Sequence, residues 1–198
     1  MKKRTGFLDN LAFIISEIGV PPLFSAIVFG ILSFSFTSEL DRALLIAFIS
    51  IFFSSVLPTA FLLWLLVSGQ IDHRHVPDKA KRTLPYIIGL FCFAIGFIIL
   101  NQMHAAPIIQ ALMFASIVNT LVTTLINLRW KISGHTIGAG AGIAGLQAAF
   151  GWHVAWLYIL VFIIGWSRVR LRVHTLSQVI GGAILGIGLT LVQMAWYL

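Results

Sequence analysis

The chain has 198 residues, of which 59% are hydrophobic and only 10% are charged. Soluble globular domains are about 45–50% apolar and about 25% charged, so this composition excludes a soluble domain and a disordered chain. The formal net charge of +7 would suggest a nucleic-acid partner in a soluble protein. Here the basic residues occupy the short connections between apolar runs. We therefore interpret them as determinants of membrane orientation and expect no nucleic-acid partner.

Successive apolar segments predict an all-α fold, a polytopic bundle of about six to seven transmembrane helices in one domain, 1–198. The segments cover 11–36, 43–67, 85–100, 108–128, two short spans within 136–166, and 175–198. Pro21 and Pro22 interrupt the first segment, which predicts an interfacial helix or a kinked span.

Residues 136–166 are too long for one span. As a single helix they would measure about 46 Å, whereas the hydrocarbon core of a bilayer is about 30 Å thick. Gly151 lies near their centre, so we predict a hairpin of two short helices. The first half is rich in glycine and alanine, which predicts a central helix because small residues allow helices to approach closely in lipid.

The basic residues lie almost entirely on one side of the predicted membrane. The side with the N-terminus and the loops 69–84, 129–135 and 167–174 carries twelve of the 13 Lys and Arg residues, and the other side carries Arg42 alone. The positive-inside rule therefore predicts a multi-pass protein of the cell membrane whose basic side faces the cytoplasm.

Three connections on the basic side carry residues suited to phosphate chemistry. They offer Lys79 and Arg82, then Ser133, Gly134 and His135, and finally Ser167, Arg168 and His174. If consecutive spans form hairpins, these connections meet at one membrane face. Cationic side chains and helix-end N–H groups suit a phosphate, and two histidines provide a nucleophile and a proton donor.

This arrangement resembles the type-2 phosphatidic acid phosphatase superfamily of membrane lipid phosphatases. The third motif of that family is Ser-Arg, five residues, His, three residues, Asp, and the chain has Ser167, Arg168, His174 and Gln178 at these positions. The second family motif is Pro-Ser-Gly-His, and the chain has Ile132, Ser133, Gly134 and His135. The first, Lys, six residues, Arg-Pro, is degraded to a stretch containing Lys79, Lys81, Arg82 and Pro85. The resemblance covers about residues 70–190.

The resemblance implies a metal-independent hydrolase that acts on a lipid phosphate or diphosphate and needs no cofactor. His174 would attack phosphorus to form a phosphohistidine, and His135 would protonate the leaving alkoxide and then activate water. The phosphate would be held by Arg168, Arg82, Ser133, the Gly134 N–H, and either Lys79 or Lys81. Phosphatidic acid, phosphatidylglycerol phosphate and polyprenyl phosphates or diphosphates all fit as substrates, and membrane lipids are the other expected partners.

Gln178 stands where the family has an Asp that orients the nucleophilic histidine. Gln178 is four residues after His174 and therefore on the same helix face. Its amide oxygen can still accept the ring N–H, but it brings no negative charge. We expect His174 to be less basic than in the family and the reaction to be slower.

Other functions fit the sequence less well or remain open. A prenyltransferase would need two Asp-rich clusters for magnesium diphosphate, whereas Asp72 and Asp78 share one loop and no second cluster follows. An intramembrane serine protease would need Gly-x-Ser-Gly, which is absent around Ser133. A degenerate homologue that binds or transports a phosphorylated lipid without catalysis remains open, because of Gln178 and the degraded first motif.

Overall fold

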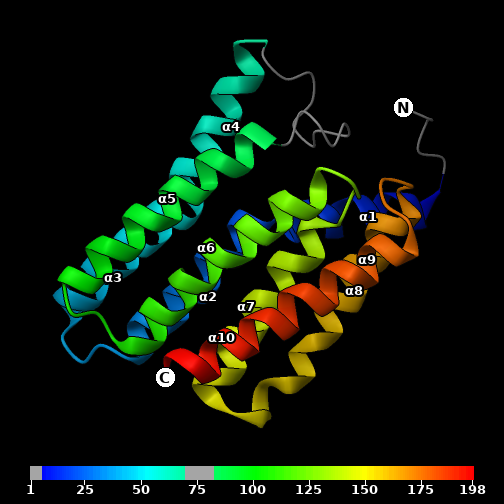
Figure 1. Cartoon of the computed structure of the whole chain (residues 1–198). Coiled ribbons are helices and arrows are strands. Elements are labelled where there is room, and N and C mark those ends of the chain that lie inside the picture. Colours follow the sequence, from blue (N-terminus) through cyan, green and yellow to red (C-terminus); the bar gives the residue numbers. More distant parts are fainter. Residues whose placement is uncertain (1–5, 70–82) are drawn as a thin grey trace.

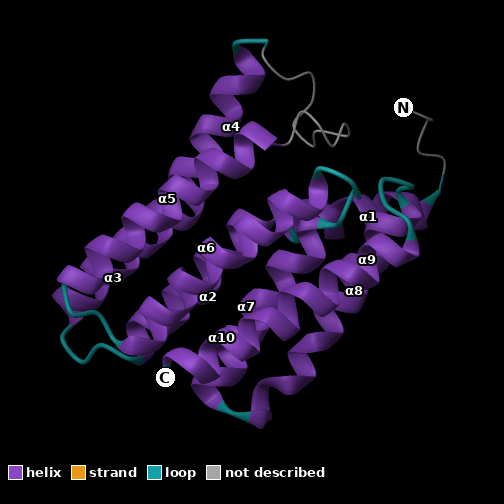
Figure 2. Ribbon diagram, viewed as in Figure 1, coloured by secondary structure: helices purple, strands orange, loops and turns teal. Residues whose placement is uncertain are grey.

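The computed structural model describes residues 6–69 and 83–198, and all regular structure within them is helical (Figures 1 and 2). The α-helices are α1 (Phe7–Ile18), α2 (Pro21–Ser35), α3 (Leu40–Ile51), α4 (Leu57–Val67), α5 (Thr83–Gln102), α6 (Pro107–Asn127), α7 (Gly134–Phe150), α8 (Ile159–Arg170), α9 (Leu176–Ile184) and α10 (Thr190–Tyr197). Short π-helical segments, η1 (Phe52–Val56) and η4 (Leu185–Leu189), join α3 to α4 and α9 to α10. A 3-10 segment, η3 (Trp152–Tyr158), leads into α8.

The described helices include five that are long and apolar enough to cross a membrane: Leu40–Val67, Thr83–Gln102, Pro107–Asn127, Trp152–Arg170 and Leu176–Tyr197. The pair α1 and α2 bends by 51° and makes a sixth if it counts as one span. The bend follows Gly19 and precedes Pro21, where we predicted a kinked span or an interfacial helix.

The structure therefore has five or six candidate spans, whereas the sequence predicted six to seven. The remaining predicted span corresponds to α7, which has 17 residues. At 1.5 Å per residue such a helix is about 26 Å long, shorter than a hydrocarbon core of about 30 Å. The predicted hairpin is nevertheless present, because Gly151, with φ of +80°, ends α7 and η3 begins directly after it.

Helix α7 lies at the centre of the bundle, as its small residues predicted. Eleven of its 17 residues are buried, and it packs against α2, α6, α8, α9, η4 and α10. Glycines at the contacts allow these helices to approach closely. A Cβ at Gly138 would lie 2.9 Å from the Pro21 side chain, and a Cβ at Gly145 would lie 2.8 Å from Leu112.

Polar side chains also join helices within the bundle. The Asn119 amide on α6 donates to the Thr190 hydroxyl over 2.8 Å and accepts from the Gln193 amide over 3.2 Å, so α6 is tied to α10. The Tyr158 hydroxyl donates to the Gln147 amide oxygen over 2.6 Å. Asn119 and Gln147 each bond a residue of another helix, as polar groups within lipid-embedded bundles tend to do.

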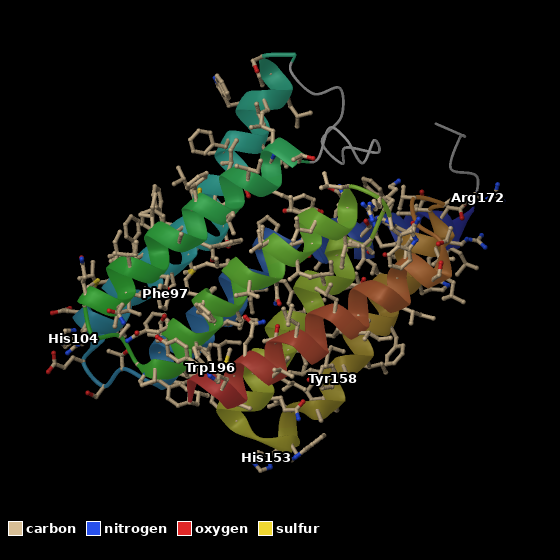
Figure 3. The ribbon with its side chains drawn as sticks, viewed as in Figure 1. Phe97, His104, His153, Tyr158, Arg172 and Trp196 are labelled. Atoms are coloured by element: carbon tan, nitrogen blue, oxygen red, sulfur yellow. The ribbon has the colours of Figure 1, made fainter. Side chains whose placement is uncertain are left out.

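The two ends of the bundle carry different connections. The α6–α7 and α8–α9 connections lie at the same end as α1, and Arg172 marks this end, whereas His104 and His153 lie toward the other end (Figures 1 and 3). The second and third motifs therefore meet at one end of the bundle, as the hairpin arrangement predicted.

The contact between α7 and η4 should be sensitive to a single methyl group. A Cβ at Gly186 would lie 2.3 Å from the backbone oxygen of Ile137, whereas a Cβ at Gly188 would meet nothing within 4 Å. Gly186→Ala is expected to lower the free energy of unfolding by about 1–3 kcal/mol. Gly188→Ala should leave it equal or slightly higher, since alanine favours helix. Thermal unfolding in detergent micelles measures both, and equal midpoints for the two variants would contradict the close approach.

Candidate active site

Three hydrogen bonds hold the second and third motifs together. The Lys131 ammonium donates to the Val173 backbone oxygen over 2.9 Å. The Ser133 backbone N–H donates to the Gln178 backbone oxygen over 3.2 Å. At the next turn of α7, the Thr136 hydroxyl is 3.1 Å from the backbone oxygen of Val179. The connection before α7 and the connection before α9 are therefore fixed side by side.

A tight turn after α8 brings His174 close to Arg168 in space. Arg172 adopts a φ of +55°, which is the left-handed region that reverses a chain sharply. The Arg168 backbone oxygen accepts from the N–H groups of Val173 and His174 at 3.2 and 3.3 Å. Both side chains are almost fully buried, with exposed fractions of 5% for Arg168 and 8% for His174. The structure thus brings the cation and the histidine of the third motif together.

Gln178 selects the tautomer of the neutral His174 ring. Thr175 and Gln178 form a capping box at the start of α9, in which the Gln178 side-chain oxygen accepts the Thr175 N–H over 3.1 Å. The same oxygen lies 3.1 Å from His174 Nδ1. Because this atom accepts, Nδ1 must carry the hydrogen in neutral His174. The lone pair of the neutral ring is then on Nε2.

A cavity of about 410 Å³ joins the two motifs to the interior of the bundle. Its polar end is formed by Gly134, His135, Arg168 and His174. The rest of its wall is formed by apolar side chains, hydroxyl groups and the Asn119 amide, mainly from α2, α4, α5, α6 and α7. Examples are Val28, Phe29, Leu62, Phe93, Leu112, Ser116 and Thr120. A ligand in this cavity would therefore meet a charged, histidine-bearing end and a largely apolar body.

The phosphate-binding residues expected from the sequence are only partly present at this cavity. Ser133 is the fully buried N-cap residue of α7 and does not line the cavity. Its hydroxyl has no hydrogen-bond partner among the described residues. Its backbone N–H bonds the Gln178 backbone oxygen and so helps to join the two motifs. Lys79, Lys81 and Arg82 lie outside the described residues.

Three further residues at this end escaped the sequence reasoning. Ser16 on α1 accepts a hydrogen bond from the Arg168 guanidinium, and no local pattern links these positions. Tyr86 on α5 lines the cavity, and a Cβ at Gly134 would lie 3.2 Å from its hydroxyl. Lys131 was interpreted only as an orientation signal, although it bonds the residue before His174. Its position two residues before Ser133 was the only available hint.

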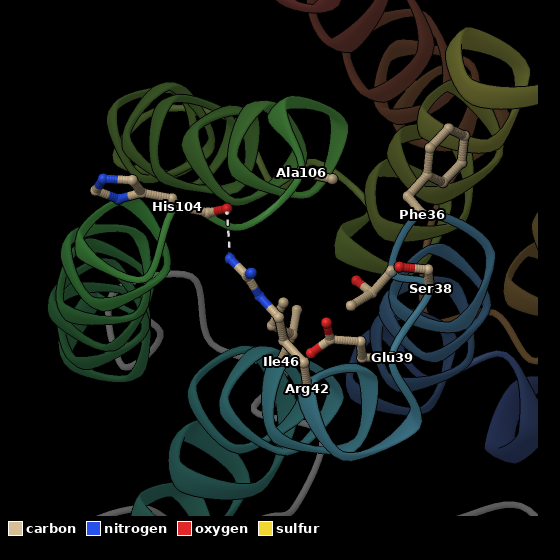
Figure 4. A pocket seen from close by; sticks show the side chains of 8 residues that line it. Phe36, Ser38, Glu39, Arg42, Ile46, His104 and Ala106 are labelled. Atoms are coloured by element: carbon tan, nitrogen blue, oxygen red, sulfur yellow. Dashed lines mark hydrogen bonds between the residues drawn. The ribbon is translucent and has the colours of Figure 1, made fainter.

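A second cavity, of about 240 Å³, lies at the other end of the bundle (Figure 4). Its lining includes Glu39, Arg42 and His104, but none of the described motif residues. The Arg42 guanidinium donates to the backbone oxygens of Met103 and His104 at 3.0 and 3.2 Å. We therefore assign Arg42 the structural role of closing the α5–α6 turn.

No family model, curated protein or solved structure matches the chain. Within 6–69 and 83–198, no three His, Cys, Asp or Glu side chains are grouped as metal ligands would be. The site is therefore interpreted from its own geometry.

The tautomer of His174 can be measured directly. In the unmodified chain above the pH at which the ring protonates, ¹⁵N NMR of labelled histidine should show His174 with its proton on Nδ1. Gln178→Leu removes the acceptor, and the Nε2–H form, which is the more common one for free histidine, should then appear. A His174 signal that is the same in both proteins would contradict the assigned hydrogen bond.

Proposed function

We propose that the protein is a membrane-embedded phosphatase that hydrolyses a lipid phosphate or diphosphate through a phosphohistidine intermediate. The observation that carries the proposal is the cavity in which His135, Arg168 and His174 meet at one end of the bundle. The resemblance of the second and third motifs to lipid phosphatases supports the same conclusion.

The first chemical step follows from the orientation of His174. Nε2 attacks phosphorus and forms a P–N bond, while the bond between phosphorus and the lipid oxygen breaks. His135 donates its proton to the departing oxygen, so that a lipid phosphate leaves as the lipid alcohol and a lipid diphosphate leaves as the lipid monophosphate. In the second step His135 takes a proton from water, the water oxygen attacks the phosphohistidine, and inorganic phosphate leaves with His174 restored.

Charge on the transferring phosphoryl group needs fixed donors. Arg168 provides a guanidinium, whose N–H groups match phosphate oxygens. Gly134 begins α7, so the N–H groups of the first turn have no partner inside the helix and point toward the same end of the cavity. The proposal also assigns phosphate contacts to Arg82 and to Lys79 or Lys81, on the basis of the resemblance.

The apolar body of the cavity supports a lipid rather than a soluble phosphate ester. Phe29, Leu62 and Phe93 line it beneath the polar end, which suits an acyl or prenyl chain. Arg170 ends α8, and Arg129 and Arg172 lie on the connections at the same end of the bundle. By the positive-inside rule, we propose that the protein resides in the cell membrane and that its site faces the cytoplasm.

The experiment that tests the function is phosphate release by purified protein from a panel of lipid phosphates and diphosphates, with EDTA present. Release is expected to persist in EDTA. His174→Ala should lower it by about a thousandfold or more, because the nucleophile is lost. His153→Ala is the matched control, since His153 is exposed at the other end of the bundle, and it should keep full activity.

Two outcomes would contradict the enzyme proposal: no release from any substrate, or equal release by the unmodified protein and His174→Ala. Lipid phosphate binding that survives His174→Ala without any turnover would favour the non-catalytic alternative, which the missing charge at Gln178 keeps open. Loss of release in EDTA, restored by a divalent cation, would contradict the metal-independent reaction.

Gln178→Glu should shift the pH dependence of the reaction. A carboxylate beside Nδ1 stabilises the protonated ring, and protonated His174 cannot attack phosphorus. The acidic limb of the kcat/KM profile is therefore expected to move to higher pH by about one unit or more, with a higher rate on the plateau. Steady-state rates between pH 4 and 9 measure this, and an unmoved acidic limb would show that His174 is not the group whose ionisation controls the rate.

A further inference from the structure

Helix α1 contacts the candidate site although it lies far outside the motif-bearing region. It packs along α8, the helix that ends in the third motif (Figure 1). Ser16 on this helix is 1% exposed, and its hydroxyl accepts a hydrogen bond from Nη1 of Arg168. A contact between two buried side chains 152 positions apart in the chain is a specific product of the fold.

Additional contacts hold α1 in this position. Asp9 pairs with Arg170 over 2.8 Å, although both side chains are partly exposed and the pair is therefore worth little by itself. Gly19, which ends α1, lies so close to α8 that a Cβ there would be 2.8 Å from Ile164. The bend of 51° before α2 then turns the chain into the bundle. Ser16 is thus held against Arg168 from both ends of its helix.

The chemistry of Ser16 suits the orientation of a phosphate-binding guanidinium. An arginine side chain has several rotatable bonds and five N–H donors in one plane. Fixing one donor fixes the direction of the others. A hydroxyl accepts this hydrogen bond without bringing a negative charge, whereas a carboxylate in the same place would compete with phosphate for the cation.

We infer that Ser16 is a positioning residue of the phosphate site, which orients Arg168 toward a phosphate group in the cavity, and that α1 is therefore part of the functional unit. The inference rests on the proposed function only in that Arg168 binds phosphate. It does not require that the lipid phosphate be hydrolysed.

The test measures the affinity of the purified full chain for inorganic phosphate by calorimetry, together with kcat/KM for the best lipid phosphate. Ser16→Ala is expected to weaken phosphate binding about tenfold, as loss of a hydrogen bond to a charged group does, and to lower kcat/KM in parallel. Ser33→Ala is the matched control, because Ser33 is a fully buried serine on α2 outside the cavity. It should change neither quantity, and a cooperative thermal unfolding transition in both variants verifies that they are folded.

A double-mutant cycle separates positioning from general packing. If Ser16 acts through Arg168, Ser16→Ala should alter the remaining phosphate affinity of Arg168→Ala by less than about twofold. The inference would be overturned if the two substitutions lowered the phosphate affinity independently, so that their effects on the binding free energy added up. It would also be overturned if Ser16→Ala left the phosphate affinity unchanged. An unmodified chain that binds phosphate in a Ser16-dependent manner but releases none from any lipid would uphold the inference and refute the proposed enzyme. An unmodified chain that binds no inorganic phosphate would overturn the inference, whereas the proposed enzyme is refuted only by the absence of phosphate release from every lipid.

Discussion

The close approach of α7 to α9 and η4 sets the distance between the two histidine-bearing connections. Gly182 and Gly186 leave room for the α7 backbone, since a Cβ on either would lie within 2.7 Å of the Ser133 or Ile137 backbone oxygen. Only when the helices are this close can the Ser133 backbone N–H reach the Gln178 backbone oxygen. The positions of His135 and His174 relative to one another therefore depend on two glycines, Gly182 and Gly186, which lie several residues away from either histidine.

The same contact places the polar groups of the site at the end of the membrane-spanning bundle. Buried ions are costly in lipid unless they face a protein interior or a polar cavity. Arg168 satisfies this condition, because it is buried between α1 and the cavity and bonds Ser16. The rest of the cavity wall has no charged side chain among the described residues and is largely apolar. This change from a charged end to a largely apolar body is the physical basis for proposing a lipid that carries a phosphate.

Some expectations from the sequence needed adjustment. Hydropathy located every connection in the described residues. Five described helices are long and apolar enough to span a membrane, or six with the bent α1–α2 pair, which is the lower end of the predicted six to seven, because α7 is short and largely buried by its neighbours. The motif pattern predicts a phosphate contact for Ser133, and the structure adds that its backbone N–H bonds the Gln178 backbone oxygen. A one-dimensional motif records which residues occur together, but it does not record which side of a turn each side chain occupies.

The sequence by itself determined the membrane class, the all-helical architecture, the hairpin at Gly151 and the residues around which a site should be sought. These properties follow from composition and local periodicity, which act along the chain. Only the tertiary structure decided that Gln178 bonds His174 and the backbone of Thr175 at once, and that Lys131 holds the turn before His174. It alone brought Ser16 to Arg168. No periodic pattern in the sequence indicates which of these residues will touch. The contacts form only when the helices pack against one another.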